Sequence, residues 1–176
     1  RRLLDAARAR GVRVVHATYE GTPGGDHPGT ARLWRALGPA TATWAPGTPE
    51  TQVVTELLAP TDLVLPRHHG LFPTLDSELL PVPRGLGVRT VVLAGVSLNL
   101  ALPITAGHTT QAGFRVIVPR DAVAGTPSEY GNQVLDNTIA VLGRVVTVDK
   151  LIARTYQDKK TMKGKVHFVL SNAIGS

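Results

Sequence analysis

The sequence contains no cysteine among its 176 residues. This absence excludes disulfide bonds, cysteine-based metal sites and catalysis by a thiolate. It also fits a reducing compartment, and we expect a cytoplasmic protein. Long apolar runs are missing too, since none approaches the roughly 20 residues that span a bilayer. We therefore expect no membrane partner.

Lysine is absent from residues 1–149, although this part holds thirteen arginines and twelve acidic residues and so carries a net charge of +1. Residues 150–176 hold five lysines, one arginine and one acid, a net charge of +5. We interpret residues 1–153 as one domain and residues 154–176 as a basic tail of different ancestry. A recombined or engineered chimera is an open alternative. Nucleic acid is not an expected partner, because the tail has only Tyr156 and Phe168 as aromatic residues.

What the chain does have is a regular alternation of strand and helix patterns. Most of the strand patterns are continuous apolar runs, which are typical of parallel strands covered on both faces. The sequence therefore predicts a three-layer α/β fold of Rossmann type with a mostly parallel five- to six-stranded sheet. The expected strands are 12–18, 62–65, 89–95, 115–119 and 144–148, with 166–170 as a sixth, and the expected helices are 1–10, 31–37, 50–58, 74–80, 99–112 and 128–142.

The most informative turn follows the strand at 89–95. A helix starts directly after this turn, so its free N–H groups face the carboxyl edge of the sheet, where α/β proteins bind ligands. We take Ser97, Leu98 and Asn99 as pocket candidates. The turn is chemically poor, because only Ser97 and Asn99 offer polar side chains.

A second group of candidates, Arg67, His68 and His69, follows the strand at 62–65. Because arginine is always charged, this group predicts a small anionic ligand. We expect no metal at His68 and His69, since adjacent residues of an extended segment point in opposite directions. We also expect no cofactor. His16, inside a strand, is expected to be a core histidine, and His108 is expected to serve packing or to lie on the surface.

Three segments can be compared with known families: LAGVSLNLALPITAGHTTQAGFRVIVPRDAVAG at 93–125, PRHHGLF at 66–72 and SEYGNQVLDNTIAVLGRVVTVDKL at 128–151. Together they resemble the isochorismatase-like (cysteine hydrolase) superfamily over about residues 1–153. The similarity is greatest to members that lack the nucleophilic cysteine. It implies a six-stranded parallel sheet in the order 3-2-1-4-5-6, a cis peptide bond between Val96 and Ser97, and a homo-oligomer.

The same resemblance implies where catalytic groups would stand. The family's hydrolases use an Asp after the first strand, a Lys after the third and a Cys at the helix after the fourth. Here the cysteine position is Ala101, and the lysine position falls at or near Arg67. We expect the family's first strand to be missing, because the chain begins in the helix that follows it. None of the three groups can then be assigned, and whether the chain is an enzyme stays open.

The main hypothesis is accordingly a ligand-binding or scaffold domain without thiol hydrolase activity. The alternative is a hydrolase of isochorismate-like or amide substrates that uses a non-thiol mechanism, which would need a general acid. Asp121 is a carboxylate at a strand end, but the family usually uses that residue structurally.

The missing strand would lie at the centre of the sheet and leave its two neighbours with unpaired backbone groups. Residues 166–170 are the spare strand, and we predict that they fill this place between the strands at 12–18 and 89–95. The segment DKKTMKGKVHFVLSNAIG at 158–175 resembles the C-terminal end of 3-dehydroquinate synthase. That resemblance implies Lys159 or Lys160 as a substrate contact in that enzyme, and we assign no such activity here.

Overall fold

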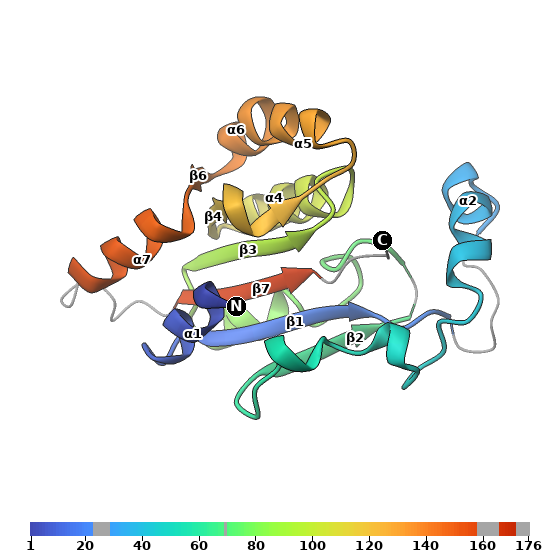
Figure 1. Cartoon of the computed structure of the whole chain (residues 1–176), viewed down its shortest axis with the longest axis horizontal. Coiled ribbons are helices and arrows are strands. Elements are labelled where there is room, and N and C mark those ends of the chain that lie inside the picture. The colour runs from blue at the N-terminus through green and yellow to red at the C-terminus, as the bar shows by residue number, and fades with distance from the viewer. Residues whose placement is uncertain (23–28, 69, 158–165, 172–176) are drawn as a thin grey trace.

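The strands form one sheet in which every pairing is parallel. The computed structural model describes residues 1–22, 29–68, 70–157 and 166–171. In this part of the chain the sheet has seven strands, six of them in the order β2-β1-β7-β3-β4-β6 (Figure 1). Their bounds are β1 (Arg13–Tyr19), β2 (Leu63–Arg67), β3 (Thr90–Val96), β4 (Arg115–Pro119), β6 (Arg144–Val146) and β7 (Val166–Ser171).

The predicted fold class is confirmed, and the strand number is one higher than expected. The additional strand is β5 (Val123–Ala124), which pairs with the end of β3 beside the main path. A two-residue strand has no periodicity, so the sequence pattern could not reveal it.

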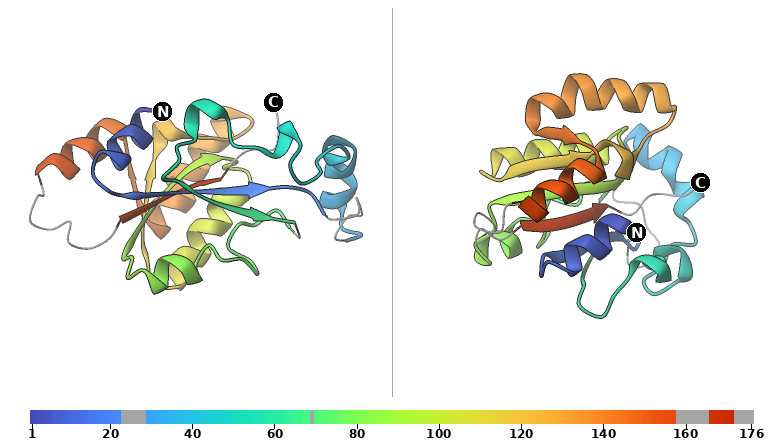
Figure 2. Two further views of the ribbon diagram at one scale, coloured as in Figure 1. Left: turned by 90° about the horizontal axis from the view of Figure 1, so that it is seen from below. Right: turned by 60° about the vertical axis from the view of Figure 1, so that its left-hand side comes forward.

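Helices cover both faces of the sheet (Figures 1 and 2). One face carries α1 (Arg2–Arg8) and α7 (Val148–Gln157), and the other carries α3 (Pro81–Gly85), α4 (Ala101–Gln111) and α5 (Ser128–Val134). A π-helical turn, η4 (Leu135–Ile139), and α6 (Ala140–Leu142) continue α5. By contrast, α2 (Arg32–Thr41) stands beyond the carboxyl end of β1 (Figure 1).

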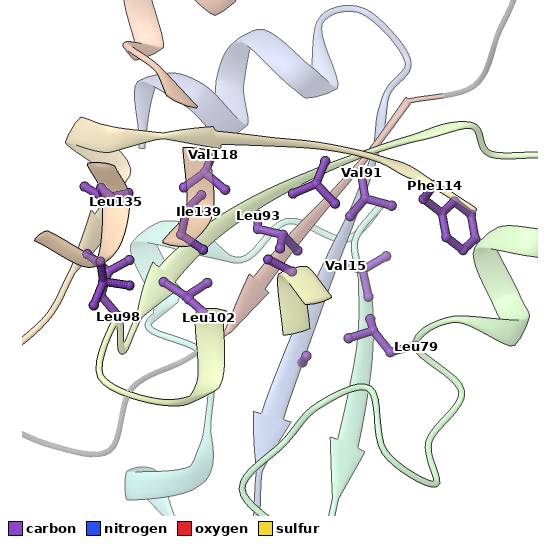
Figure 3. Close-up of a cluster of buried hydrophobic side chains, with 14 of the residues drawn as sticks. Val15, Leu79, Val91, Leu93, Leu98, Leu102, Phe114, Val118, Leu135 and Ile139 are labelled. Atoms are coloured by element: carbon purple, nitrogen blue, oxygen red, sulfur yellow. The ribbon is translucent and has the colours of Figure 1, made fainter. Parts of the chain in front are cut away.

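The alternating side chains of the strands build two cores. Val91 and Leu93 of β3 point into the larger cluster, together with Leu98 from the turn before α4 and Leu102 from the first turn of α4 (Figure 3). Val92 of β3 belongs to the smaller cluster under α1 and α7. Each fully buried Val or Leu side chain contributes about 1.5–3 kcal/mol. Because β3 is buried on both faces, its sequence reads as a continuous apolar run.

The last strand of the chain lies in the middle of the sheet. β7 pairs with β1 from Arg13↔His167 to Ala17↔Ser171, and with β3 from Thr90↔Val166 to Gly95↔Ser171. The prediction that residues 166–170 fill the central place is therefore confirmed. With β7 in first position, the strand order matches the predicted 3-2-1-4-5-6 arrangement.

Two of the predicted helices are wrong. Residues 74–80 form turns, and the helix is Pro81–Gly85 instead. Pro81 and Pro83 follow the predicted helix, and such residues usually end one. Here they occupy the first turn of the observed helix, where N–H groups have no partner within the helix. The predicted helix at 50–58 is a pair of 3₁₀ turns, η1 (Pro49–Thr51) and η2 (Thr55–Leu57). The strand predicted to run to residue 148 ends at Val146, because α7 begins at Val148.

Candidate functional site at the carboxyl edge

The parallel strands bring the predicted site residues to one edge of the sheet. Arg67 is the last residue of β2, and His68 follows it. Ser97 follows β3, and Ala101 is the first residue of α4. This is the edge at which open α/β sheets bind their ligands. His69 lies outside the described residues.

Arg67 is a buried cation, with 4% of its surface exposed. Its Nη1 donates hydrogen bonds to the carbonyl oxygens of Ala17 at 3.1 Å and Thr18 at 2.9 Å. Nε donates to Gly70 O at 2.9 Å, and Nη2 donates to Leu71 O at 2.8 Å. The side chain therefore ties the end of β1 to the loop after β2.

The charge of Arg67 is not neutralised by these contacts. Burial lowers its pKa to about 10, so the group is still protonated at pH 7. The guanidinium also lies 5.6 Å from the centroid of the Tyr19 ring. No carboxylate of the described residues lies within ion-pair distance. Four of its five N–H donors serve neutral carbonyls, so one donor and a full positive charge remain.

Arg67 is also one of the residues that line a pocket of about 480 Å³. Its walls come from the ends of β1 and β2 and from the loop before α3: Ala17, Leu65, Pro66, Arg67, His68, Pro73, Asp76, Ser77, Glu78 and Leu79. Asp76 and Glu78 are exposed, so water screens their charges more than that of Arg67. The loop wall was not predicted, because residues 74–80 were assigned to a helix.

His68 is held at the wall of this pocket. Its Nδ1 lies 3.3 Å from Gly21 O, and a carbonyl only accepts, so Nδ1 carries the proton in this contact. Gly21 has φ +68°, and a Cβ there would lie 1.9 Å from Trp44 O. Glycine is thus required at the residue that positions His68.

The polar groups of the turn after β3 bind one another. The Val96–Ser97 peptide bond is cis. Ser97 Oγ donates to Asn99 Oδ1 and accepts from the Asn99 N–H, both at 2.9 Å. Asn99 Oδ1 accepts from Thr126 N at 2.9 Å, and its Nδ2 donates to Thr126 O at 2.5 Å. Ser97 and Asn99 therefore fasten the turn to the loop before Pro127.

Leu98 and Ala101 present only hydrocarbon at this edge. Leu98 is 2% exposed and belongs to the larger core cluster, so it packs in the interior instead of lining the Arg67 pocket. A Cβ at Gly125 would lie 2.9 Å from Leu98 Cβ, which shows how tightly this turn is packed. Ala101 is 6% exposed at the start of α4. Its methyl group has no nucleophilic atom.

Asp121 has a structural contact, in line with its sequence interpretation. Its Oδ1 accepts a hydrogen bond from Val148 N, the first residue of α7, at 2.8 Å. His108 Nδ1 lies 2.8 Å from Thr74 Oγ1 in an exposed contact. Across the described residues, no group of three His, Asp or Glu side chains is arranged to hold a metal ion.

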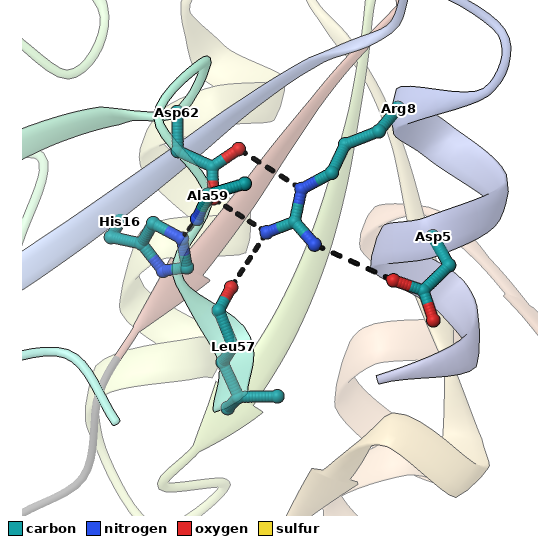
Figure 4. A network of polar contacts seen from close by, with 6 residues as sticks. All are labelled: Asp5, Arg8, His16, Leu57, Ala59 and Asp62. Carbon is teal, nitrogen blue, oxygen red and sulfur yellow. Dashed lines mark hydrogen bonds and ion pairs between the residues drawn. The ribbon is translucent and has the colours of Figure 1, made fainter. Parts of the chain in front are cut away.

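His16 is a core histidine, as predicted, and it belongs to a polar network that the sequence did not reveal (Figure 4). Its Nε2 lies 2.9 Å from Asp62 Oδ2, and Asp62 also accepts from Arg8 Nε at 3.1 Å and Nη2 at 2.5 Å. Burial acts to raise the pKa of Asp62, but the hydrogen bonds from Arg8, His16 and Ala59 N outweigh it and lower the pKa. The network joins α1 and β1 to the turn directly before β2, and none of its three side chains lines the Arg67 pocket.

Comparison with known proteins identifies the fold and its family. A model of the isochorismatase domain matches residues 1–150. The chain belongs to the isochorismatase family. A cysteine hydrolase from Pseudomonas syringae pv. phaseolicola has a similar solved structure, with a TM-score of 0.75, 24% sequence identity, and coverage of 89% of this chain and 78% of that chain.

Two curated relatives are similar in sequence. Maleamate amidohydrolase of Pseudomonas putida is 32% identical over 149 residues, which is 82% of this chain and 67% of that protein. An uncharacterised isochorismatase family protein of Escherichia coli, YecD, is 28% identical over 89 residues, 51% of this chain. The chain spans 46% of the length of YecD in that match.

Among the described residues, no helix is both long and apolar enough to cross a membrane.

Proposed function

We propose that this isochorismatase-family domain binds a small carboxylate in the pocket beside Arg67 and does not hydrolyse it by the thiol route. The observation that carries the proposal is the buried guanidinium of Arg67, which keeps its charge, has no carboxylate partner among the described residues and borders a pocket of about 480 Å³. An anion there gains from a cation that water screens weakly. Arginine also offers the planar donor geometry that suits a carboxylate.

The chemistry of the relatives supports a carboxylate ligand. The enzyme similar over 82% of this chain is named for maleamate, a small molecule with one carboxylate and one amide. A carboxylate of that size is compatible with the volume of the Arg67 pocket. Maleamate is therefore the first probe to use.

The missing nucleophile supports binding without thiol turnover. The chain has no cysteine, and the position that the family resemblance gives to the nucleophile is Ala101. The hydroxyl of Ser97 is bound to Asn99, and Asp121 is bound to the start of α7. A non-thiol hydrolase would need a general acid beside the ligand.

A scaffold role and a homo-oligomer stay predictions. Light scattering coupled to size-exclusion chromatography measures the oligomeric state.

Binding and turnover are tested separately on the full chain. Maleamate is titrated by isothermal calorimetry, and released ammonia is measured in a parallel assay. We expect saturable binding with a dissociation constant on the order of 1 mM or tighter and no ammonia above the buffer rate. Ammonia release that rises linearly with protein concentration would contradict binding without turnover and would favour the non-thiol hydrolase instead.

Variants connect the binding to this pocket. His68→Ala removes a wall of the pocket and is expected to weaken maleamate binding several-fold without unfolding the domain. Arg67→Lys keeps the positive charge but loses the planar, forked set of N–H donors, so it tests whether binding needs the guanidinium geometry. Arg120→Gln removes a positive charge outside the pocket and is the control for long-range electrostatics, because Arg120 is an exposed partner of Asp136. If Arg120→Gln weakens binding as much as His68→Ala does, the ligand is not held in this pocket.

A further inference from the structure

The loop after α2 packs against the end of β1 through an aromatic pair. The ring centroids of Trp44 and Tyr19 are 6.1 Å apart, and the ring planes are tilted by 53°. A tilted arrangement at this separation is favourable for aromatic rings. Tyr19 is the last residue of β1 and is 6% exposed, so the contact lies at the buried end of this strand.

The Tyr19 ring connects Trp44 to Arg67. The Arg67 Cζ atom lies 5.6 Å from the centroid of the Tyr19 ring, within the range of a cation–π contact. Because this guanidinium is buried, water screens the attraction only weakly. The backbone supports the same connection, since Glu20 N donates to Arg67 O at 3.0 Å. A shift of the Tyr19 ring therefore changes the surroundings of the Arg67 cation.

The backbone of Trp44 connects the same loop to His68. A Cβ at Gly21 would lie 1.9 Å from Trp44 O, so the two backbones touch. Gly21 O in turn accepts the hydrogen bond from His68 Nδ1 at 3.3 Å. The position of Trp44 thus limits where Gly21 O lies, and Gly21 O orients the His68 ring. Arg67 and His68 both line the pocket, whereas Trp44 is not among the described residues that line it.

Hydrogen bonds fix the backbone on both sides of Trp44. Its N–H donates to Thr41 O at 3.0 Å, and Thr48 N donates to Ala45 O at 3.1 Å. The hydroxyl of Thr51, which is 3% exposed, donates to Thr48 O at 2.8 Å. A side chain on an ordered backbone holds its neighbours at a smaller cost in conformational entropy than one on a free loop.

On the basis of the proposed carboxylate binding, we propose that Trp44 is a positioning residue for the Arg67 pocket. One route runs through Tyr19 to the guanidinium, and the other runs through Gly21 to the His68 imidazole. Trp44 does not contact the ligand; its ring holds the end of β1 in place. Removal of the ring leaves both lining groups in the chain but less ordered, and binding then weakens because the site is less preorganised.

The first experiment compares Trp44→Ala with Trp34→Ala in maleamate calorimetry on the full chain. Trp34 is the matched control, because it is the second of the two tryptophans, lies on α2 and has no ring contact with Tyr19 among the described residues. We expect Trp44→Ala to weaken binding about threefold to tenfold, the effect of losing one aromatic pair. Trp34→Ala should change it less than about twofold.

Two further substitutions at the same position separate the ring from its volume. Trp44→Phe keeps a ring against Tyr19 and should restore most of the maleamate affinity. Trp44→Leu keeps apolar volume without a ring, so it should bind as weakly as Trp44→Ala, and it takes the place of that variant if Trp44→Ala does not fold. Thermal unfolding verifies that each variant is folded.

A second measurement needs no ligand. Arg67 Nε donates to Gly70 O at 2.9 Å, and a buried N–H of this kind gives a signal in a proton–nitrogen correlation NMR spectrum. Arg67→Lys assigns the signal by removing it. We expect Trp44→Ala to shift and broaden it and Trp34→Ala to leave it in place, because the Tyr19 ring lies next to the guanidinium. A purely structural Trp44 would lower the unfolding temperature without changing this signal in the folded variant.

Three outcomes would contradict a positioning role. They are an unchanged Arg67 Nε–H signal in folded Trp44→Ala, maleamate binding by this variant as tight as in the unsubstituted chain, and equal weakening by Trp34→Ala. Failure of the proposed function gives a different pattern, in which the unsubstituted chain does not bind maleamate. The Arg67 signal then still reports whether Trp44 positions this side chain.

Discussion

At the residue scale, the same pair of side chains has different consequences in different surroundings. Arg8–Asp62 and Arg120–Asp136 both have an arginine nitrogen 2.5 Å from a carboxylate oxygen. The Asp62 side chain is 1% exposed, whereas that of Asp136 is 58% exposed. Because solvent screens exposed charges, only the Asp62 network is expected to affect stability strongly.

Asp62→Ala is therefore expected to destabilise the domain by about 3 kcal/mol, because Arg8 and buried His16 lose their shared acceptor. Asp136→Ala is the matched control and is expected to change stability by less than about 0.5 kcal/mol. Urea unfolding followed by circular dichroism measures both. Equal effects of the two substitutions would show that the buried network has no special role.

Asp62 also predicts a dependence of stability on pH. Its pKa is lower in the folded chain than in the unfolded chain, where it is about 3.9. The charged form is thus favoured by folding, and its contribution is present above the unfolded pKa. It is lost as the pH falls through the lowered folded pKa. Urea unfolding between about pH 2 and pH 6 should show an acid loss of stability that Asp62→Asn lacks. Parallel curves for the two proteins would contradict this assignment.

At the scale of elements, Asp121 joins the end of one strand to the beginning of a distant helix. Its hydrogen bond to Val148 N satisfies one of the N–H groups that α7 cannot satisfy internally. A carboxylate is also favoured at this end of a helix by the helix dipole. The residue therefore contributes to the docking of α7 against the sheet.

Asp121→Ala is expected to cost about 1 kcal/mol of stability, the usual loss for a helix N-terminal acceptor. Amide hydrogen exchange should quicken in the first turn of α7. Maleamate affinity should stay the same, because Asp121 does not line the Arg67 pocket. Asp149→Ala removes an exposed acid from the same helix turn and serves as the control. Loss of maleamate binding in Asp121→Ala would instead favour a catalytic or ligand role for this carboxylate.

At the scale of the whole molecule, the fold depends on its last strand. β7 lies between β1 and β3 and pairs with five and six residues of these strands, respectively. Without β7, both neighbours would have backbone N–H and C=O groups without partners. Each such group costs about 1–3 kcal/mol when buried. The summed cost of the unpaired groups along β1 and β3 would exceed the total stability of a typical domain, about 5–15 kcal/mol.

Deleting residues 158–176 is therefore expected to abolish cooperative unfolding and to leave a chain that binds the hydrophobic dye ANS. A synthetic peptide of residues 158–176, added in excess, should restore the cooperative transition by filling the central place. A scrambled peptide of the same composition is the control. A truncated chain that unfolds cooperatively without the peptide would show that β7 is dispensable.

The sequence by itself determined the α/β class, because buried parallel strands read as apolar runs and their helices as periodic patterns. It also determined the carboxyl edge as the location of Arg67, Ser97 and Ala101, and it excluded a thiol nucleophile. Local patterns failed where spatial neighbours decide: Pro81 and Pro83 begin a helix, and nothing near Asp62 in sequence indicates that Arg8 and His16 converge on it. Only the tertiary structure decided that Arg67 binds backbone carbonyls and that Asn99, which is bonded to Ser97, binds Thr126. Hydrogen bonding and charge compensation depend on residues distant in the chain, which periodicity and composition do not encode.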